Sequence, residues 1–180
     1  IVDVGGGTTE IAVMSLGGVV FSKSLRIAGD AMDGAIINYM RKKFNLLIGE
    51  STAEKIKKEI GTAIPTTNNV FLMKGRDIRT GTPKEISLTE EDACEALMPI
   101  LNQMLAAIKE ALESTPPELS ADLVDMGLVL TGGGALLKNI DKLISKDTGL
   151  PVTIADNPLE CVAIGTGKAL ENEELFSTMM

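Results

Sequence analysis

Histidine and tryptophan are absent from the sequence, and only two cysteines occur among its 180 residues. Without histidine, and with Cys94 and Cys161 far apart, a zinc site has almost no ligands to draw on, and a Ser-His-Asp or Cys-His triad is excluded. Both cysteines lie inside apolar helical patterns, so we expect buried free thiols in a reducing compartment. The sequence therefore argues against zinc enzymes and histidine-dependent hydrolases.

Aromatic residues make up only 3% of the chain, and negative charge outweighs positive charge, with a formal net charge of −8. Nonspecific nucleic-acid binding needs a cationic surface and often aromatic stacking platforms, so we expect no nucleic-acid partner. No apolar run reaches the roughly 18 residues that a membrane-spanning helix needs. No secretory signal is visible either. The composition is otherwise typical of a soluble globular protein, with 44% hydrophobic and 23% charged residues.

Short apolar strands near both ends of the chain, with helices after two glycine-rich loops, indicate an α/β fold. The middle of the chain has the pattern of an insertion into that fold. We expect one α/β subdomain built from 1–31 and 89–180, which carries both glycine loops, and a smaller α+β subdomain at 32–88. The sequence begins at Ile1 inside a strand, so we expect a piece of a longer polypeptide.

The first glycine-rich loop reads Asp3-Val4-Gly5-Gly6-Gly7-Thr8-Thr9 and follows an apolar strand. Three consecutive glycines remove every Cβ, so bare backbone can approach a ligand and its N–H groups can point at an anion. On one interpretation the loop binds a phosphate with the help of Thr8 or Thr9, and Asp3 holds water on a Mg²⁺ ion. On the other interpretation it is only a hairpin turn that Asp3 caps.

The second loop reads Thr131-Gly132-Gly133-Gly134-Ala135 and leads from a strand into a predicted helix. Its glycines leave room for the flat face of a base or for a ribose, and the helix N-terminus favours an electronegative neighbour. A tight strand-to-helix connection is the alternative. Neither loop fits the P-loop or the Rossmann signature. Two such loops, each after a buried strand, suggest opposite walls of one nucleotide cleft.

Three helix starts are predicted from capping residues. Asp30 can N-cap a helix that continues through 32–44. The run Ser51-Thr52-Ala53-Glu54 matches a capping box, in which the Glu54 side chain would return to the start of its own helix. Thr89 can cap a long helix with an apolar stripe.

The two loops, their order and the intervening insertion resemble the superfamily of actin, sugar kinases and seventy-kilodalton heat-shock chaperones. More closely, the chain resembles the MreB family of bacterial actin-like, rod-shape-determining proteins. The resemblance covers nearly the whole chain and implies an actin-like ATPase domain with a ribonuclease-H-like mixed sheet flanked by helices. It is carried by the stretches 2–10, 26–30, 35–39, 47–50, 52–54, 74–77, 115–119, 130–137 and 164–167.

The resemblance also implies a role for each residue that matches a family motif, with ATP or ADP and Mg²⁺ as ligands. Asp3 would hold magnesium through water, and Thr8 and Thr9 would place the attacking water. Glu54 would flank the ribose and adenine together with Lys57, which lies one helical turn away on the same face. Glu54 has a rival role in the capping box, and Lys57 can equally be a solvated surface lysine. The glycines Gly5, Gly6 and Gly7 would contact the β- and γ-phosphates, and the adenosine pocket would be lined by Gly132, Gly133, Gly134 and Ala135.

One departure from the family pattern limits the activity that we expect. The first phosphate loop of the family and its water-activating carboxylate belong to an N-terminal domain that this sequence lacks. We therefore expect the chain alone to bind ATP weakly and to turn it over negligibly.

The resemblance implies a cytoskeletal ATPase that polymerises head to tail into filaments and maintains rod cell shape. Domain closure around a nucleotide would control this assembly. It further implies a cytoplasmic protein at the inner face of the cell membrane, with membrane contact through the missing N-terminal half. Its partners would be cell-wall synthesis and membrane morphogenesis proteins. A sugar or acid kinase, or a chaperone-type ATPase of the same superfamily, is the alternative.

Overall fold

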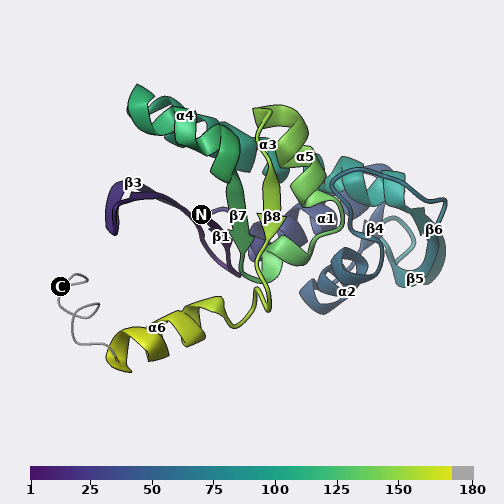
Figure 1. The fold of residues 1–180 in the computed structure, drawn as a ribbon. Coiled ribbons are helices and arrows are strands. Elements are labelled where there is room, and N and C mark those ends of the chain that lie inside the picture. The colour runs from purple at the N-terminus through teal and green to yellow at the C-terminus, as the bar shows by residue number, and fades with distance from the viewer. Residues whose placement is uncertain (172–180) are drawn as a thin grey trace.

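The computed structural model describes residues 1–171, and a mixed five-stranded sheet occupies one end of the molecule (Figure 1). The strand order is β3-β2-β1-β7-β8. The strands β1, β2 and β3 form an antiparallel meander, whereas β1, β7 and β8 run parallel. The bounds are β1 (Val2–Val4), β2 (Thr9–Ser15), β3 (Gly18–Leu25), β7 (Leu128–Thr131) and β8 (Val152–Ile154).

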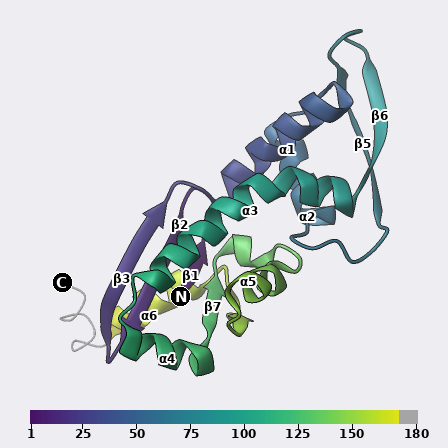
Figure 2. The ribbon, with the colours of Figure 1, turned by 90° about the horizontal axis from the view of Figure 1, so that it is seen from above.

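A second, antiparallel sheet lies at the opposite end of the molecule (Figure 2). Its order is β4-β5-β6, with β4 (Leu46–Leu47), β5 (Val70–Asp77) and β6 (Pro83–Thr89). The helices α1 (Gly29–Phe44) and α2 (Glu50–Ile60) pack against each other beside it. This sheet falls almost entirely within 32–88, although the subdomain boundary itself stays a prediction.

The helix α3 (Glu90–Glu113) runs from the second sheet to the five-stranded sheet and packs on both ends of the molecule (Figure 2). Thr89 begins it as predicted, because its Oγ1 accepts a hydrogen bond from the Asp92 N–H at 3.2 Å. The Asp92 carboxylate in turn accepts a hydrogen bond from the Thr89 N–H at 3.0 Å, which completes a capping box. The buried side chains Leu97, Leu101 and Ile108 then join one hydrophobic core that extends under both sheets.

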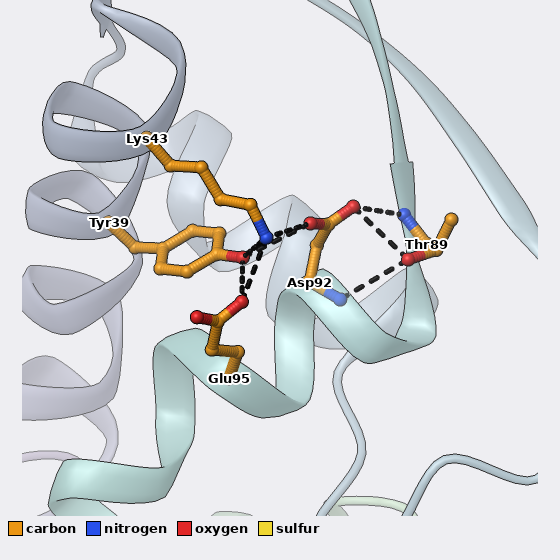
Figure 3. A network of polar contacts seen from close by, with 5 residues as sticks. All are labelled: Tyr39, Lys43, Thr89, Asp92 and Glu95. Carbon is orange, nitrogen blue, oxygen red and sulfur yellow. Dashed lines mark hydrogen bonds and ion pairs between the residues drawn. The ribbon is translucent and has the colours of Figure 1, made fainter.

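A polar network fixes α1 against the first turns of α3 (Figure 3). The Tyr39 hydroxyl donates to Asp92 at 3.1 Å or to Glu95 at 2.6 Å, and the Lys43 ammonium donates to both carboxylates at 3.0 and 2.8 Å. Burial and the two neighbouring carboxylates raise the pKa of Tyr39 well above its usual range. The phenol, which is protonated at neutral pH in any case, therefore stays a donor even in alkaline solution.

The remaining helices are α4 (Pro117–Met126), the 3₁₀ turn η1 (Gly133–Leu136), α5 (Ile140–Thr148) and α6 (Cys161–Glu171). The helix expected directly after the second glycine loop does not begin there, because the chain first makes η1 and then passes Asn139 in a left-handed conformation. Both cysteines are free, but only Cys94 is buried, so the expectation was wrong for Cys161, which is partly exposed. Among the helices of residues 1–171, none has the length and apolar character to cross a membrane.

Asp30 does not cap α1, contrary to expectation. The first residue of α1 is Gly29, and Ala28 occupies the N-cap position. No side chain of residues 1–171 caps the helix. The predicted capping box at Ser51 is also absent, since α2 begins at Glu50 and Gly49 occupies the N-cap position. The side chains of Asp30 and Ser51 therefore remain available for other contacts.

Candidate functional site

The parallel pairing of β1 with β7 brings the two glycine loops together. Asp3 lies opposite Thr131 in this register, so both loops leave the sheet at the carboxyl ends of adjacent strands. A Cβ added at Gly132 would lie only 2.4 Å from Asp3 Oδ1 and from the Val4 carbonyl oxygen, and one at Gly134 would lie 2.2 Å from Val4 Cγ1. The absence of side chains at these two glycines is therefore what allows the second loop to rest on the end of β1.

The first loop is held against the N-terminus of α1 through its carbonyl groups. The Gly29 N–H donates to Gly5 O at 3.2 Å, and the Asp30 N–H donates to Gly6 O at 2.8 Å. The loop closes on itself through the Gly5 N–H and the Thr8 carbonyl at 2.9 Å. Among residues 1–171 the exposed N–H groups of Gly6 and Gly7 have no backbone acceptor, so they can bind an anion.

The two threonines that follow the first loop differ in what they can do. Thr9 is fully buried in β2, and its hydroxyl donates to the Ile27 carbonyl at 2.6 Å. Thr8 is exposed at the tip of the loop. The expectation that both threonines place a reactive water is therefore wrong for Thr9, whose hydroxyl instead fixes the strand next to the loop. For Thr8 it stays a prediction.

Asp3 is half-buried at the end of β1, next to the first loop and directly under Gly132. It offers a carboxylate where the two glycine loops meet. Magnesium commonly takes one or two protein carboxylates and completes its shell with water and phosphate oxygens, so this residue fits the expected Mg²⁺ site. Its role stays a prediction.

The structure connects Lys57 to the first loop. The Lys57 ammonium donates to the Gly29 carbonyl at 3.0 Å and to Asp33 Oδ2 at 2.8 Å, and it is therefore no freely solvated surface lysine. Gly29 in turn donates to Gly5, so α2, α1 and the loop form one hydrogen-bonded chain. The expected contact of Lys57 with a nucleoside is compatible with this position.

Glu54 lies one turn before Lys57 on α2 but points its carboxylate elsewhere. It pairs with Lys58 at 2.7 Å, and this lysine lowers the pKa of the Glu54 carboxyl. Because the capping box is absent, Glu54 does not cap α2. A ligand would have to compete only with an exposed ion pair, which contributes little to stability.

The second loop is tied to the segment before α6. The Gly132 N–H and the Thr131 hydroxyl both donate to the Pro158 carbonyl, at 2.9 and 3.1 Å. Gly133 is exposed and Gly134 is partly exposed, whereas Ala135 is fully buried and can line a pocket only through its neighbours.

Sequence reasoning missed the place of two acidic side chains of α1 in the site. The Asp30 carboxylate lies 3.8–3.9 Å from the positions that Cβ atoms of Gly6 and Gly7 would occupy, and Asp33 pairs with Lys57. Burial raises the pKa of the Asp33 carboxyl, and the ion pair with Lys57 opposes this effect. Their spacing of three residues in a helix could have revealed a shared face.

A cavity of about 280 Å³ lies at the other end of the five-stranded sheet, between β2, β7, α3 and α4. Its lining is mostly apolar and includes Ile1, Ile108, Leu123 and Leu128, but none of the predicted site residues. A nucleotide needs anion-binding groups, which the glycine loops supply and this cavity does not. We therefore place the candidate site at the loops.

A family model described as MreB/Mbl protein matches residues 1–178. The chain belongs to the MreB/Mbl family. Its relatives in this family include the cell shape-determining protein MreB of Escherichia coli K12, with 52% identity over 95% of this chain and 50% of that protein. The cell shape-determining protein Mbl of Bacillus subtilis 168 is 46% identical over 96% and 52%. The chain thus spans about half the length of the curated relatives it matches.

Solved structures agree with this family and confirm the actin-like fold. MreB5 of Spiroplasma citri bound to AMPPNP superposes with a TM-score of 0.91 at 39% identity, over 94% of this chain and 51% of that one. The same protein bound to ADP gives the same TM-score. A MamK double helical filament superposes with a TM-score of 0.70 at 25% identity, over 88% and 49%. The MreB/Mbl chain described here therefore has close structural neighbours that bind nucleotides and a more distant one that forms filaments.

Proposed function

We propose that this MreB/Mbl chain supplies a phosphate loop and the adenosine wall of an actin-like ATPase that assembles into filaments. The single observation that carries the proposal is the meeting of two glycine loops at the ends of β1 and β7, with Asp3 between them. The nucleotides bound to MreB5 of Spiroplasma citri support the same ligand class, ATP and ADP.

Each residue of the site has a chemical task in this proposal. The free N–H groups of Gly6 and Gly7 bind phosphate oxygens, and the Thr8 hydroxyl orients the attacking water. Asp3 holds the water shell of Mg²⁺, which when bound neutralises charge on the phosphate groups. On the nucleoside side, the second loop faces the base, and Glu54 and Lys57 of α2 flank the ribose and adenine.

Filament formation follows from the same cleft in this proposal. Nucleotide binding closes the two halves of the full polypeptide, and the closed form adds head to tail. A head-to-tail contact that does not close into a ring gives an open filament. We propose the cytoplasm at the inner membrane face as the location, with cell-wall synthesis and membrane morphogenesis proteins as partners and membrane contact through the half that this chain does not cover.

The test measures ATP affinity with and without Mg²⁺ in the protein that carries these residues, together with sedimentation of polymer in ATP and in ADP. The variant Asp3→Asn keeps the size of the side chain and removes its charge. We expect this variant to lose most of the increase in ATP affinity that Mg²⁺ produces. A tenfold loss of affinity corresponds to about 1.4 kcal/mol of binding free energy. The control is Asp125→Asn, because Asp125 is exposed on α4 and remote from the loops.

Failure of the wild type to bind ATP, or an Asp3→Asn protein with unchanged Mg²⁺ dependence, would contradict the proposal. Polymer that sediments only with ATP favours the cytoskeletal function. Turnover that depends on an added sugar would instead favour a kinase of the same superfamily. The chain of residues 1–180 alone is expected to bind ATP weakly and to release phosphate negligibly.

A further inference from the structure

The Lys57 ammonium is held in place by two protein acceptors. It donates to the Gly29 carbonyl at 3.0 Å and to Asp33 Oδ2 at 2.8 Å, and both side chains of the ion pair are more than four-fifths buried. An ammonium group carries three N–H donors. Two of them fix its position, so one remains for a further acceptor.

The Asp33 carboxylate is unusual because only one of its two oxygens has a hydrogen-bond partner among the described residues. Asp33 Oδ1 is buried and has no hydrogen-bond partner among the described residues. Buried polar atoms in folded proteins nearly always have a partner, and a buried ion pair with an unmet acceptor is a poor source of stability. The pair therefore needs an explanation other than stabilisation of the fold.

Two further carboxylates lie near the ion pair. Glu54 lies one turn before Lys57 on the same helix, and the charges of Glu54 and Asp30 both act on Asp33. Without Asp33, the flexible lysine would be drawn toward these two exposed groups. With Asp33, it is directed toward Gly29, whose N–H donates to Gly5 of the first loop at 3.2 Å.

From this arrangement we infer that Asp33 is a positioning residue for the nucleotide, because it holds Lys57 against Gly29 with one N–H directed at the nucleoside. The inference rests on the proposed function and adds to it a residue that acts through Lys57. The ligand group that this N–H recognises is an acceptor of the nucleoside, either a ribose oxygen or a ring nitrogen of the base.

A double-mutant cycle tests this inference. The dissociation constant for a fluorescent ATP analogue is measured by anisotropy for the wild type, Asp33→Ala, Lys57→Met and the double variant. We expect Asp33→Ala to raise the dissociation constant by about 10-fold, which corresponds to about 1.4 kcal/mol. The double variant is expected to bind no more weakly than Lys57→Met, because Asp33 has no effect without the lysine.

The matched control is Asp147→Ala, which breaks an ion pair with Lys109 of similar length, 2.9 Å, between α5 and α3. We expect it to leave the dissociation constant unchanged. Thermal unfolding of each variant shows whether it is folded. If Asp33→Ala does not fold, Asp33→Asn takes its place, with a smaller expected rise because the amide oxygen can still accept from Lys57.

Two results would overturn the inference while leaving the proposed function intact. One is wild-type affinity in the folded Asp33 variant. The other is an equal loss of affinity with and without Lys57, which would show that Asp33 acts only on the local structure. A wild-type protein that fails to bind the analogue would overturn the proposed function, and the inference with it.

Discussion

Replacement of Gly132 by alanine would test the close approach of the second glycine loop to β1. Gly132 has a φ of +80°, and its added Cβ would lie 2.4 Å from Asp3 Oδ1 and from the Val4 carbonyl oxygen. Carbon atoms do not approach backbone oxygen so closely, so either the loop or the strand must shift. The variant therefore perturbs the site through the backbone and through the Asp3 carboxylate.

The expected cost has two parts. An alanine at a left-handed position costs about 1–2 kcal/mol, and overpacking that moves the backbone costs about 1–3 kcal/mol more. Gly149 also has a positive φ of +74°, but its ψ of 3° lies in the ordinary left-handed region, whereas the ψ of 172° at Gly132 lies in a region essentially restricted to glycine. Because no heavy atom lies within 4 Å of its added Cβ, Gly149→Ala sets a lower bound on the first part. We expect Gly132→Ala to lower the free energy of unfolding by about 2 kcal/mol more than Gly149→Ala does.

Urea denaturation measures this difference directly. With an m-value of about 2 kcal/mol/M, a difference of about 2 kcal/mol moves the midpoint by about 1 M. The same samples are titrated with ATP, and Gly132→Ala alone is expected to lose affinity, because only it separates the two loops. Equal midpoints for the two variants would refute the contact between the second loop and β1.

Two further predictions concern the second sheet and the helices beside it. Glu90 is 2% exposed and accepts hydrogen bonds from the Thr66 and Thr67 N–H groups at 3.1 and 3.0 Å, which lower the pKa of its carboxyl. The charged Glu90 side chain contributes fully to stability above its unfolded-state pKa, and this contribution is lost as the pH falls through the lowered folded-state pKa. Urea midpoints measured across this acidic range should therefore fall less steeply for Glu90→Gln than for the wild type. Glu90→Gln should also cost about 1–3 kcal/mol at neutral pH, because charge-assisted hydrogen bonds are lost, and an unchanged midpoint there would contradict this role. Tyr39→Phe removes the hydroxyl that contacts Asp92 and Glu95, and calorimetry should show a loss of about 1 kcal/mol with unchanged ATP affinity, whereas a loss of affinity would link this network to the site.

The sequence was sufficient to predict the actin-like fold and the meeting of the two glycine loops. Each glycine triplet alone also fitted a plain turn, but the combination of motifs resembled one family closely enough to indicate it. Thr89 was also identified correctly as a cap, because a threonine before a run of acidic residues and an apolar stripe leaves little ambiguity about where the helix starts.

Helix starts elsewhere were predicted incorrectly because the capping patterns fitted more than one register. Ser51 and Glu54 have the spacing of a capping box, but the same residues fit a helix that begins at Glu50 and pairs Glu54 with Lys58. The ion pair between Lys57 and Asp33 could not be predicted from the sequence, since these residues lie on different helices. Such a contact depends on how α1 and α2 pack, which local patterns do not specify.

The pairing of β1 with β7 also has a consequence for synthesis of the protein. Thr131 is synthesised 128 residues after its neighbour Asp3. At about 5–20 residues per second, this interval lasts roughly 6–26 s. During that time one edge of β1 has no partner strand, so the nascent chain is open to mispairing until β7 emerges.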